Sequence, residues 1–344
     1  MRQAVLLVGG RATRVWPLSA RRPKGLLPVA GLAFLEYQLR LVARVGVEEV
    51  VLAVGRDHLE AWREYVAAWS GAPALSLSIE EEPLDTAGPV VEALDRLDDE
   101  FLVLNGDVVL DVDLGRLVED SPSGAAATIA LVRVEDPSAY GVVVTDPGRM
   151  VERFVEKPAP GTAPADTVNA GIYLMTRAAL DPYPRGRLSF ERVVFPALAE
   201  AGSLGGVVVE GGWLDIGTPD LLLDTNGFVL QGGSSLHAPG SAHGGSGGRR
   251  EGAWSWVAEG AEVAEDAVVA ESLVLAGARI GPGARLHRGV VGWDATVGRD
   301  AVVRGAAVVG PGAVVGDGCE LEAGARVAPG AHLPAHSITF RPPD

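Results

Sequence analysis

Residues 4–29 read AVLLVGGRATRVWPLSARRPKGLLPV, and this stretch decides the fold of the first part of the chain. It opens with a short apolar run that ends at Gly9 and Gly10, which is typical of a buried strand. Glycines directly after a first strand let the backbone approach a ligand closely, with several N–H groups pointing at its phosphates. Arg14 and Lys24 would add cationic charge. The stretch is neither GxxxxGK[ST] nor GxGxxG, so it is not a P-loop or a dinucleotide fingerprint.

Strand-like and helix-like segments alternate over the first 230 residues. This alternation favours an α/β, Rossmann-like fold, in which a mainly parallel mixed sheet is covered by helices on both faces and extended by hairpins. The predicted strands are 4–8, 50–54, 74–79 and 101–104, the hairpin-like strands are 125–134, 141–145, 150–155 and 168–175, and the predicted helices are 34–45, 58–69, 90–97, 190–201 and 219–230.

Residues 231–252 contain eight glycines and four serines and show no apolar periodicity. Such a composition cannot bury enough apolar surface to offset its ordering entropy, so we predict a flexible linker. We therefore divide the chain into an N-terminal domain over 1–230, this linker, and a C-terminal domain over 253–344.

The C-terminal domain has a six-residue repeat. One aliphatic and one small residue in each repeat describe a triangular coil of three short strands per turn, with the aliphatic residues pointing inward, for about four and a half turns. Two five-residue steps interrupt the period, before Val274 and before Val291. The pattern resembles the hexapeptide-repeat family of left-handed parallel β-helices. The regular aliphatic positions are Val297, Val303, Val309, Val315, Leu321, Val327 and Leu333, and the small ones are Ala301, Ala307, Ala313, Cys319, Ala325, Ala331 and Ser337.

The composition excludes several classes of partner. The chain has 344 residues and a formal net charge of −16, and its longest basic run is Arg21-Arg22. Nucleic acids and anionic membranes need a concentrated Lys/Arg face, so we expect neither as a partner. The single cysteine, Cys319, cannot form an internal disulfide and fits a reducing cytosol. The first apolar run is too short for a signal peptide or a membrane span, so we predict a cytoplasmic protein.

The signature around Gly9 resembles that of the sugar-1-phosphate nucleotidyltransferases, or NDP-sugar pyrophosphorylases, usually written G-G-x-G-T-R-L-x-P-L-T…P-K-x-L-x-P-V. Nearly every fixed position is met over 21 residues, and the whole run looks closest to the mannose-1-phosphate guanylyltransferases. One departure is Ala12, which stands where the family has glycine. If that position has a positive φ, Ala12 is strained by about 1 kcal/mol.

The resemblance implies a nucleotide and metal site. Asp107 ends a strand-like run that matches L-x-x-N-G-D, and Asp215 lies in a segment similar to W-x-D-I-G-T-P. Ligands of open α/β sheets bind at the carboxyl ends of strands, and two carboxylates with triphosphate oxygens suit Mg²⁺. We therefore expect Mg²⁺ on Asp107 and Asp215. The nucleotide-binding residues implied on this side are Val8, Gly9, Gly10, Arg11, Ala12, Thr13, Asn105 and Asp107.

The resemblance also implies a sugar-phosphate side. Glu156 and Lys157 match the family's E-K-P motif, Asn169 begins its N-A-G-I-Y motif, and Tyr140-Gly141 begins its Y-G-V-V strand. Carried over to these positions, Glu156 and Asn169 bind sugar hydroxyls, Gly141 lines the sugar pocket beside Tyr140, and Lys157 holds the sugar phosphate.

The base side rests on residues 81–88, EEPLDTAG, which resemble the family's E-P-L-G-T-A-G. A carboxylate such as Glu82 would suit guanine, whose Watson–Crick edge offers two adjacent N–H donors, so we favour GTP. Asp85 replaces a glycine of the motif, and two interpretations stay open: it alters the choice of base, or it caps a helix that starts near Thr86. The nucleotide-binding residues expected here are Glu82, Asp85, Thr86, Ala87 and Gly88.

The resemblance implies transfer of a nucleoside monophosphate from a triphosphate to a sugar-1-phosphate or sugar-like (cyclitol) phosphate. The enzyme would position two repelling anions and neutralise charge on the α-phosphate and leaving group, with Arg14, Lys24 and Lys157 as the catalytic cations. One alternative is a catalytically weak regulatory subunit, because Ala12 and Asp85 depart from the motif. Another is a bifunctional enzyme whose β-helix transfers acyl groups. We expect the β-helix to drive homo-oligomerisation.

Overall fold

A computed structural model of the chain describes residues 1–236 and 249–339. The chain divides into two compact units. The first, called here the sheet unit, comprises Met1–Arg11 and Leu35–Trp213. The second, called the β-helix unit, comprises Ala12–Phe34 and Leu214–Asp344. The signature segment that follows Arg11 therefore belongs with the C-terminal part of the chain.

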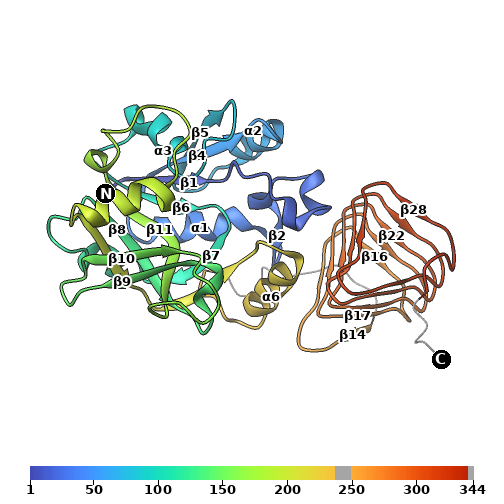
Figure 1. Ribbon diagram of the computed structural model, residues 1–344. Helices are drawn as coiled ribbons and strands as arrows, with labels where there is room; N and C mark the ends of the chain where they lie inside the picture. The colour runs from blue at the N-terminus through green and yellow to red at the C-terminus, as the bar shows by residue number, and fades with distance from the viewer. Residues whose placement is uncertain (237–248, 340–344) are drawn as a thin grey trace. The chain divides into compact units, whose positions relative to one another are not determined.

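A mixed sheet of nine strands forms the centre of the sheet unit (Figure 1). Its order is β10-β9-β11-β6-β1-β4-β5, with β8 pairing with both β11 and β12. β6, β1, β4 and β5 are parallel, whereas β11 is antiparallel to β6, β8 and β9. The predicted mainly parallel mixed sheet is thus confirmed. The strands are β1 (Gln3–Leu7), β4 (Glu49–Gly55), β5 (Ala74–Glu80), β6 (Glu100–Asn105), β8 (Ala127–Arg133), β9 (Gly141–Thr145), β10 (Val151–Glu156), β11 (Thr167–Thr176) and β12 (Leu204–Val208).

Each of the five predicted helical segments contains a helix. The segment 190–201 differs in detail, because it starts as a π-helical turn, η7 (Phe190–Val194), before α5. Several elements escaped the sequence interpretation. They include α4, the strand β12, and the short strand β7 (Val108–Val112), which pairs with β13 (Gly211–Asp215). The helices are α1 (Phe34–Ala43), α2 (Leu59–Ala68), α3 (Gly88–Ala93), α4 (Leu114–Glu119), α5 (Phe195–Glu200) and α6 (Pro219–Leu230).

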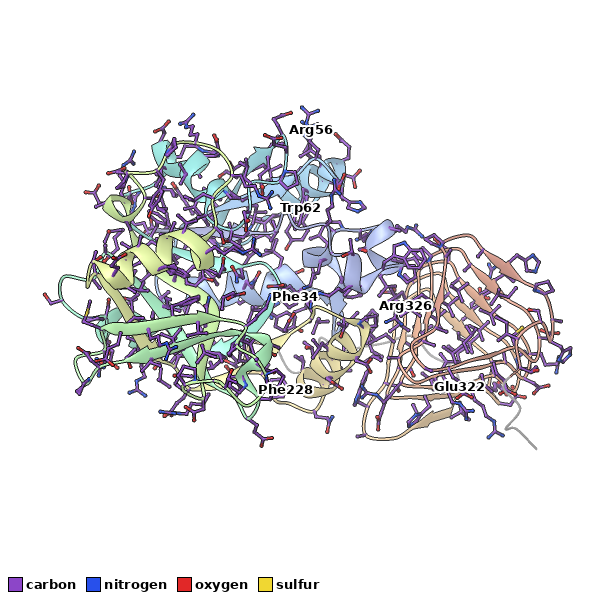
Figure 2. All side chains as sticks on the ribbon, in the orientation of Figure 1. Phe34, Arg56, Trp62, Phe228, Glu322 and Arg326 are labelled. Atoms are coloured by element: carbon purple, nitrogen blue, oxygen red, sulfur yellow. The ribbon has the colours of Figure 1, made fainter. Side chains whose placement is uncertain are left out.

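The core of the sheet unit lies between the sheet and its helices. Tyr173 on β11 and Phe190 and Phe195 on η7 and α5 are fully buried, with ring centroids 4.9–5.3 Å apart. Trp62 of α2 is also buried, with 1% of its surface exposed (Figure 2). These large aromatic side chains contribute much of the buried apolar area that stabilises the sheet.

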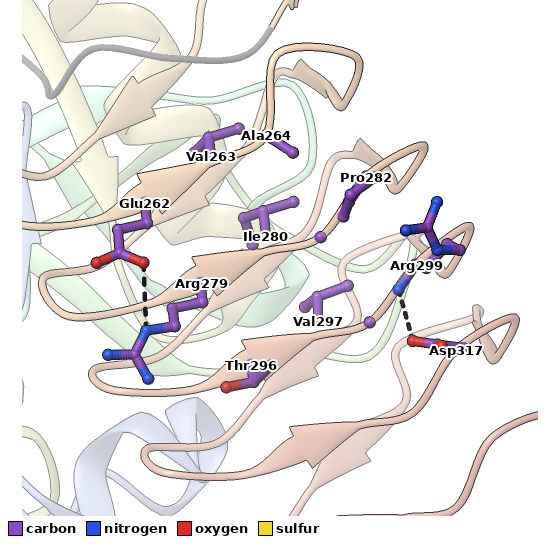
Figure 3. Close-up of a pocket in the computed structure, with 12 residues that line it drawn as sticks. Glu262, Val263, Ala264, Arg279, Ile280, Pro282, Thr296, Val297, Arg299 and Asp317 are labelled. Atoms are coloured by element: carbon purple, nitrogen blue, oxygen red, sulfur yellow. Dashed lines mark hydrogen bonds and ion pairs between the residues drawn. The ribbon is translucent and has the colours of Figure 1, made fainter.

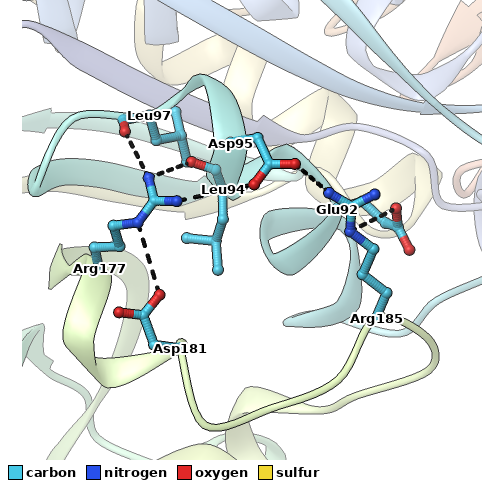
Figure 4. Close-up of polar contacts among 7 residues, drawn as sticks. All are labelled: Glu92, Leu94, Asp95, Leu97, Arg177, Asp181 and Arg185. Carbon is cyan, nitrogen blue, oxygen red and sulfur yellow. Dashed lines mark hydrogen bonds and ion pairs between the residues drawn. The ribbon is translucent and has the colours of Figure 1, made fainter.

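A polar network fixes the turn before β6. The Arg177 guanidinium donates hydrogen bonds to the carbonyls of Leu94 and Leu97, at 2.7 and 3.1 Å, and lies 3.9 Å from the carboxylate of Asp95 (Figure 4). Arg185 also contacts Asp95. These bonds satisfy the carbonyls of the first residue and the C-cap of the short helix η4 (Leu94–Arg96) and so hold the start of β6 in place.

The C-terminal strands form three parallel sheets of five strands each, stacked as coils (Figure 1). This arrangement confirms the expected left-handed β-helix. Each of the three sheets, called walls here, has five strands, whereas the repeat count suggested about four and a half turns. The first wall contains β14 (Arg249–Glu251), β17 (Val268–Ala270), β20 (Arg285–His287), β23 (Val302–Arg304) and β26 (Glu320–Leu321); the second β15 (Trp256–Val257), β18 (Leu273–Val274), β21 (Val290–Val291), β24 (Val308–Val309) and β27 (Arg326–Val327); the third β16 (Glu262–Val263), β19 (Arg279–Ile280), β22 (Thr296–Val297), β25 (Val314–Val315) and β28 (His332–Leu333).

The two five-residue steps in the repeat fall at the same corner of successive coils. Val274 pairs with Val291, 17 residues later, whereas Val291 pairs with Val309, 18 residues later. At the shortened corner Ser272 is fully buried, and its hydroxyl donates to the carbonyl of Ala270 and accepts from the N–H of Gly289. The buried hydroxyl thus satisfies backbone groups at this corner, where the period is short.

The repeat residues of the β-helix face inward as predicted. Val297, Val303, Val309 and Val315 are fully buried in one apolar cluster, together with Ala301, Ala307, Ala313 and Cys319. Of the predicted linker 231–252, residues 237–248 lie outside the described part of the chain. Arg249–Glu251 form β14 of the first wall, so the β-helix begins before the predicted boundary at residue 253. None of the helices in the described part of the chain is long and apolar enough to cross a membrane.

Adjacent residues of β23 offer a test of the coil interior. Val303 points inward and is fully buried, whereas Val302 is half-buried on the outer surface. We expect Val303→Ala to lower the free energy of unfolding of the β-helix by about 2 kcal/mol, because it removes buried methyl groups and leaves a cavity. Val302→Ala is the matched control and should cost less than about 0.5 kcal/mol. Equal losses in chemical denaturation would contradict the inward register.

Candidate active site

The first strand ends in a backbone turn with no space for a side chain at Gly9. A Cβ added to Gly9 would lie 2.4 Å from Glu80 Oε1 and 3.0 Å from the backbone nitrogen of Gly55. A Cβ on Gly106 would lie 2.4 Å from the carbonyl oxygen of Leu7. The N–H of Val8 donates to the carbonyl of Ala53. The predicted nucleotide loop therefore runs tightly between the carboxyl ends of β4, β5 and β6.

Glu80 is the carboxylate beside this turn. It pairs with Gly55 at the ends of β5 and β4, and its Oε2 accepts a hydrogen bond from the N–H of Leu84. Burial raises the pKa of Glu80, while the bond from Leu84 lowers it by a smaller amount. Glu82, the carboxylate that we expected to read the base, is exposed. The sequence interpretation thus missed Glu80, because the register of β5 decides which of three successive glutamates faces Gly9.

The rest of the predicted base segment is bonded within the sheet unit. Asp85 has a φ of 67°, so it occupies the left-handed conformation that the family's glycine would adopt without strain. Its carboxylate accepts from the N–H of Thr86 and lies 3.6 Å from the Arg187 guanidinium. α3 begins only at Gly88 after Ala87, and no side chain caps it, so the helix-cap interpretation of Asp85 is wrong.

Thr86, Ala87 and Gly88 hold the neighbouring loop. The Thr86 hydroxyl donates to Glu191 Oε2 at 2.7 Å and accepts from the N–H of Phe190 at 2.9 Å. The N–H groups of Ala87 and Gly88 both donate to the carbonyl of Leu188. These hydrogen bonds anchor the base segment, residues 81–88, to residues 188–191.

A buried glutamine supports the loop that carries Asp107. Gln38 of α1 has 1% of its surface exposed, and its amide donates to the carbonyls of Asn105 and Val108, at 2.7 and 3.1 Å. These carbonyls flank Gly106 and Asp107. The side-chain oxygen of Asn105 is buried and accepts no hydrogen bond from the described residues, which suits a donor group of a ligand.

The sugar-side residues meet across β9, β10 and β11. Glu156 pairs with Gly141, and a Cβ on Gly141 would lie 3.0 Å from Glu156 Oε2. Lys157 follows with a φ of 46°, and its ammonium lies 3.5 Å from Glu156 Oε1. A lysine in this strained conformation is a feature that clusters at functional sites.

Asn169 begins an irregular turn within β11. Its Oδ1 accepts from the N–H of Gly171, whose φ is 77°, and its Nδ2 donates to the Tyr173 hydroxyl. The pairing of β11 with β8 shifts register between Asn169 and Tyr173, so the turn re-aims the asparagine. Trp213, which we had not assigned, donates from Nε1 to the carbonyl of Ala170. Its ring meets that of Tyr140 edge-on, with centroids 5.1 Å apart.

In the β-helix unit the structure gathers the cations of the signature with Asp215. Lys24 Nζ lies 3.8 Å from Asp215 Oδ1, and both side chains are largely shielded from solvent. The N–H of Gly217 donates to Asp215 Oδ1 at 2.6 Å. A Cβ on Gly217 would lie 2.9 Å from Arg14 Nη2. The two segments are about 190 residues apart in sequence, and their meeting supports the assignment of Arg14, Lys24 and Asp215 to one site.

Ala12 starts this signature segment in a strained conformation. Its φ of 49° and ψ of 40° are left-handed, and its carbonyl accepts from the N–H of Val15 in the short helix η1 (Thr13–Val15). The positive φ on which the predicted strain depended is therefore present, and Ala12 carries the strain that the family's glycine avoids. Gly10 and Arg11 precede it in the exposed part of the turn, and Thr13 follows, also exposed.

The donor chemistry fits a hard divalent metal. Asp107 and Asp215 offer carboxylate oxygens, which Mg²⁺ prefers. Among the described residues, no group of three or more His, Cys, Asp and Glu side chains could hold a metal. A metal here would take its other ligands from water or from a bound nucleotide, as is usual for Mg²⁺ with phosphates. Asp107 lies in the sheet unit and Asp215 in the β-helix unit, so their sharing of one ion stays a prediction.

A separate groove of about 530 Å³ lies on the third wall of the β-helix (Figure 3). Its charged rim includes Glu262 and Arg279, paired at 3.3 Å, and Asp317, which accepts from the N–H of Arg299. None of the residues that line the groove is a histidine. The groove therefore gives no support to acyl transfer by a histidine base.

Comparison with known proteins identifies the family. Residues 3–232 match the family model described as nucleotidyl transferase. A mannose-1-phosphate guanylyltransferase of Mycobacterium tuberculosis is 42% identical over 226 residues, which are 63% of this chain and 61% of that protein. A mannose-1-phosphate guanyltransferase of Gibberella zeae is 35% identical over 259 residues, 71% of this chain and 70% of its own. The chain thus matches less than two thirds of the bacterial relative's length.

Solved structures share the fold of the first part of the chain. The crystal structure of HddC from Yersinia pseudotuberculosis aligns with a TM-score of 0.55 and 27% identity, covering 66% of this chain and 98% of that one. A second structure of HddC, complexed with GMP-PN, aligns with a TM-score of 0.56 over the same shares.

Gly9 and Gly10 form a matched pair for testing the turn. Gly9→Ala places a methyl group against Glu80 and the backbone of Gly55, whereas Gly10→Ala meets nothing within 4 Å. We expect Gly9→Ala to destabilise the unliganded protein by about 1–3 kcal/mol, because overpacking shifts the loop or the glutamate. Gly10→Ala should change thermal stability by less than about 0.5 kcal/mol. Similar melting temperatures for the two variants would be evidence against the tight turn.

Proposed function

Because the chain belongs to the nucleotidyl transferase family, we propose that it transfers a nucleoside monophosphate from GTP to a sugar-1-phosphate, giving an NDP-sugar and pyrophosphate. The observation that carries the proposal is the meeting of Arg14 and Lys24, from the signature segment, with Asp215, from a motif about 190 residues later. Mannose 1-phosphate is the first candidate acceptor, because relatives that share 42% and 35% identity are named for it. A cyclitol phosphate is the second.

In the proposed reaction an oxygen of the sugar phosphate attacks the α-phosphorus of the triphosphate in line. The bond from this phosphorus to the β-phosphate bridge oxygen breaks, and pyrophosphate leaves. No protein nucleophile is needed. The protein holds two anions together, so Arg14 and Lys24 neutralise charge on the triphosphate and Lys157 on the sugar phosphate. Mg²⁺ held by Asp107 and Asp215 would neutralise further charge on the phosphates.

We assign the choice of base to Glu80. An ionised carboxylate offers two acceptor oxygens, and guanine presents two adjacent N–H donors. Glu80 stands beside Gly9 and is partly desolvated, whereas Glu82 is exposed. A desolvated acceptor discriminates strongly against bases that cannot fill it, because the unpaired group then costs free energy.

On the sugar side, Glu156 and Asn169 would accept and donate hydrogen bonds to hydroxyls. The Tyr140–Trp213 ring pair gives this side an apolar surface next to the polar groups. Such a combination suits a sugar ring, which has hydroxyl edges and apolar C–H faces.

Cellular setting and assembly remain proposals of the same kind. The cysteine content favours the cytoplasm, and the first and third walls of the β-helix favour association with copies of the chain. A catalytically weak regulatory subunit is the competing function. The left-handed Ala12 and Asp85 are what favour it, since both carry strain at positions where the family has glycine.

A matrix of triphosphates and sugar phosphates, with Mg²⁺ or with chelator, tests the proposed reaction through pyrophosphate release. We expect turnover with GTP and a sugar-1-phosphate, and loss of turnover with chelator. Asp107→Asn should lower kcat by about 100-fold or more, comparable with loss of a main charge-stabilising group. A wild-type chain that binds GTP without turnover with any acceptor would favour the regulatory subunit.

Glu80→Gln tests the base assignment. The amide offers one acceptor and one donor, which match uracil rather than guanine, so kcat/KM should fall by about 10- to 100-fold for GTP and rise for UTP. Glu82→Gln, at an exposed position, is the matched control and should leave the preference unchanged.

The raised pKa of Glu80 adds a pH signature. Only the ionised carboxyl accepts both guanine N–H groups. GTP affinity should therefore fall as the pH drops through the pKa of Glu80, which burial raises from the ordinary value of a glutamate. Glu80→Gln should abolish this decline. The same decline in wild type and variant would remove Glu80 from the base site.

A further inference from the structure

The signature segment contacts the β-helix as well as Asp215. Residues 12–34 and the β-helix lie in the same compact unit, although the β-helix begins more than 200 residues later. Two side-chain contacts between them arise from one corner of the coil, Trp293-Asp294, between β21 and β22. This corner is therefore a candidate for controlling the segment that carries Arg14 and Lys24.

Asp294 departs from the pattern of its corner. The equivalent positions in neighbouring coils are Gly277, Gly312 and Gly330, and all four residues have a positive φ. A left-handed conformation favours glycine, and aspartate adopts it at a cost. The Asp294 carboxylate lies over Gly277 and accepts a hydrogen bond from Arg21 Nη1 at 2.5 Å. The Asp294 side chain thus stands at a position where glycine would be less strained, and it binds the signature segment.

The adjacent residue makes the second contact. The guanidinium of Arg22 lies over the Trp293 ring, with 5.6 Å between its carbon and the ring centroid. This distance is within the range of a cation–π interaction. Arg21 and Arg22 are followed by Pro23 and Lys24, so the two contacts fix the backbone just before the lysine.

The β-helix also contacts the signature segment indirectly, through α6. Arg288 of the β-helix donates to Asp224 Oδ1 at 2.9 Å and to Asp220 Oδ1 at 3.2 Å, both on α6. Asn226 of the same helix is fully buried and accepts from the N–H of Ala30 at 2.8 Å. Ala30 lies in the hairpin of β2 (Pro28–Val29) and β3 (Leu32–Ala33), four residues after Leu26 at the end of the short helix η3 that begins at Lys24.

The second wall of the β-helix is buried within the chain. Leu273, Val290 and Val308 alternate with the inward-facing valines of their strands, yet all three have no exposed surface. This wall is not an open face for a partner. Arg288 immediately precedes its central strand, β21, with Gly289 between them.

We infer that the β-helix positions the phosphate-binding segment, and that Asp294 and Trp293 are positioning residues for Arg14 and Lys24. The inference rests on the proposed function of these two cations. Loss of the corner contacts makes Arg21 and Arg22 and the backbone before Lys24 more mobile. Arg14 and Lys24 then occupy the productive geometry for binding the triphosphate for a smaller fraction of the time. The β-helix then serves catalysis in each chain, in addition to any role in assembly.

The corner contacts are exposed, so the expected effects are modest. An exposed ion pair or cation–π contact changes an equilibrium by about five-fold at most. We expect Asp294→Asn to raise KM for GTP by about 2- to 5-fold, and the double variant Trp293→Ala/Asp294→Asn by about 10-fold. Arg21→Gln/Asp294→Asn should be no worse than either single change, because both remove the same contact.

Asp300 supplies the matched control. It is also an aspartate at a left-handed corner, with its carboxylate over Gly283, and forms no ion pair among the residues that the structure describes. Asp300→Asn should leave KM unchanged. If it raises KM as much as Asp294→Asn, or if Asp294→Asn has no effect, the positioning role is wrong.

Hydrogen exchange of the unliganded protein separates this inference from the proposed function. We expect the double variant to speed amide exchange at several positions between Thr13 and Leu27, with the amides of the coil interior unchanged, and Asp300→Asn to alter neither. Faster exchange in an enzyme without guanylyltransferase activity would sustain the positioning role and overturn the function. Unchanged exchange together with an unchanged KM would overturn the positioning role itself.

Discussion

The close approach of backbone to backbone at Gly9 is the constraint on which the rest of the site depends. Three strand ends meet there, at Leu7, Gly55 and Glu80, and a single methyl group on Gly9 would collide with two of them. The absence of a side chain leaves the backbone N–H groups of the turn close to any ligand that lies on it. On a chain with a net charge of −16, such groups bind an anion without adding positive residues.

The charged residues that we assign to the site come from both compact units. The sheet supplies Asp107 and Glu80 at the carboxyl ends of β6 and β5, where ligands of open α/β sheets bind. The signature segment supplies Arg14 and Lys24, and it belongs to the unit built around α6 and the β-helix. The residues that we assign to the triphosphate thus have two structural supports. We therefore expect a change in the β-helix to act on Arg14 and Lys24 through the signature segment.

The sequence predicted the features that depend on local repetition or on a long motif. The six-residue period and its two five-residue steps predicted the coil and its corners, because every coil repeats the same steric requirement. The signature predicted the turn, and the conditional strain at Ala12 followed from glycine's freedom at positive φ. Asp85 also stands where the family has glycine, and its conformation is left-handed too. Its pairing with Arg187, however, depends on a loop about 100 residues away.

Other features required the tertiary structure. Three consecutive glutamates look equivalent in the sequence, and only the pairing of β5 with β4 turns Glu80 toward Gly9. Trp213 meets Tyr140, and Asp294 meets Arg21, over separations that no periodicity encodes.

The most direct measurement of the central claim, that the Gly9 turn binds the triphosphate, is a crystal structure with GTP and Mg²⁺. We expect the triphosphate on the backbone of residues 9–13, with the metal on Asp107. A triphosphate bound elsewhere would contradict the role of the Gly9 turn.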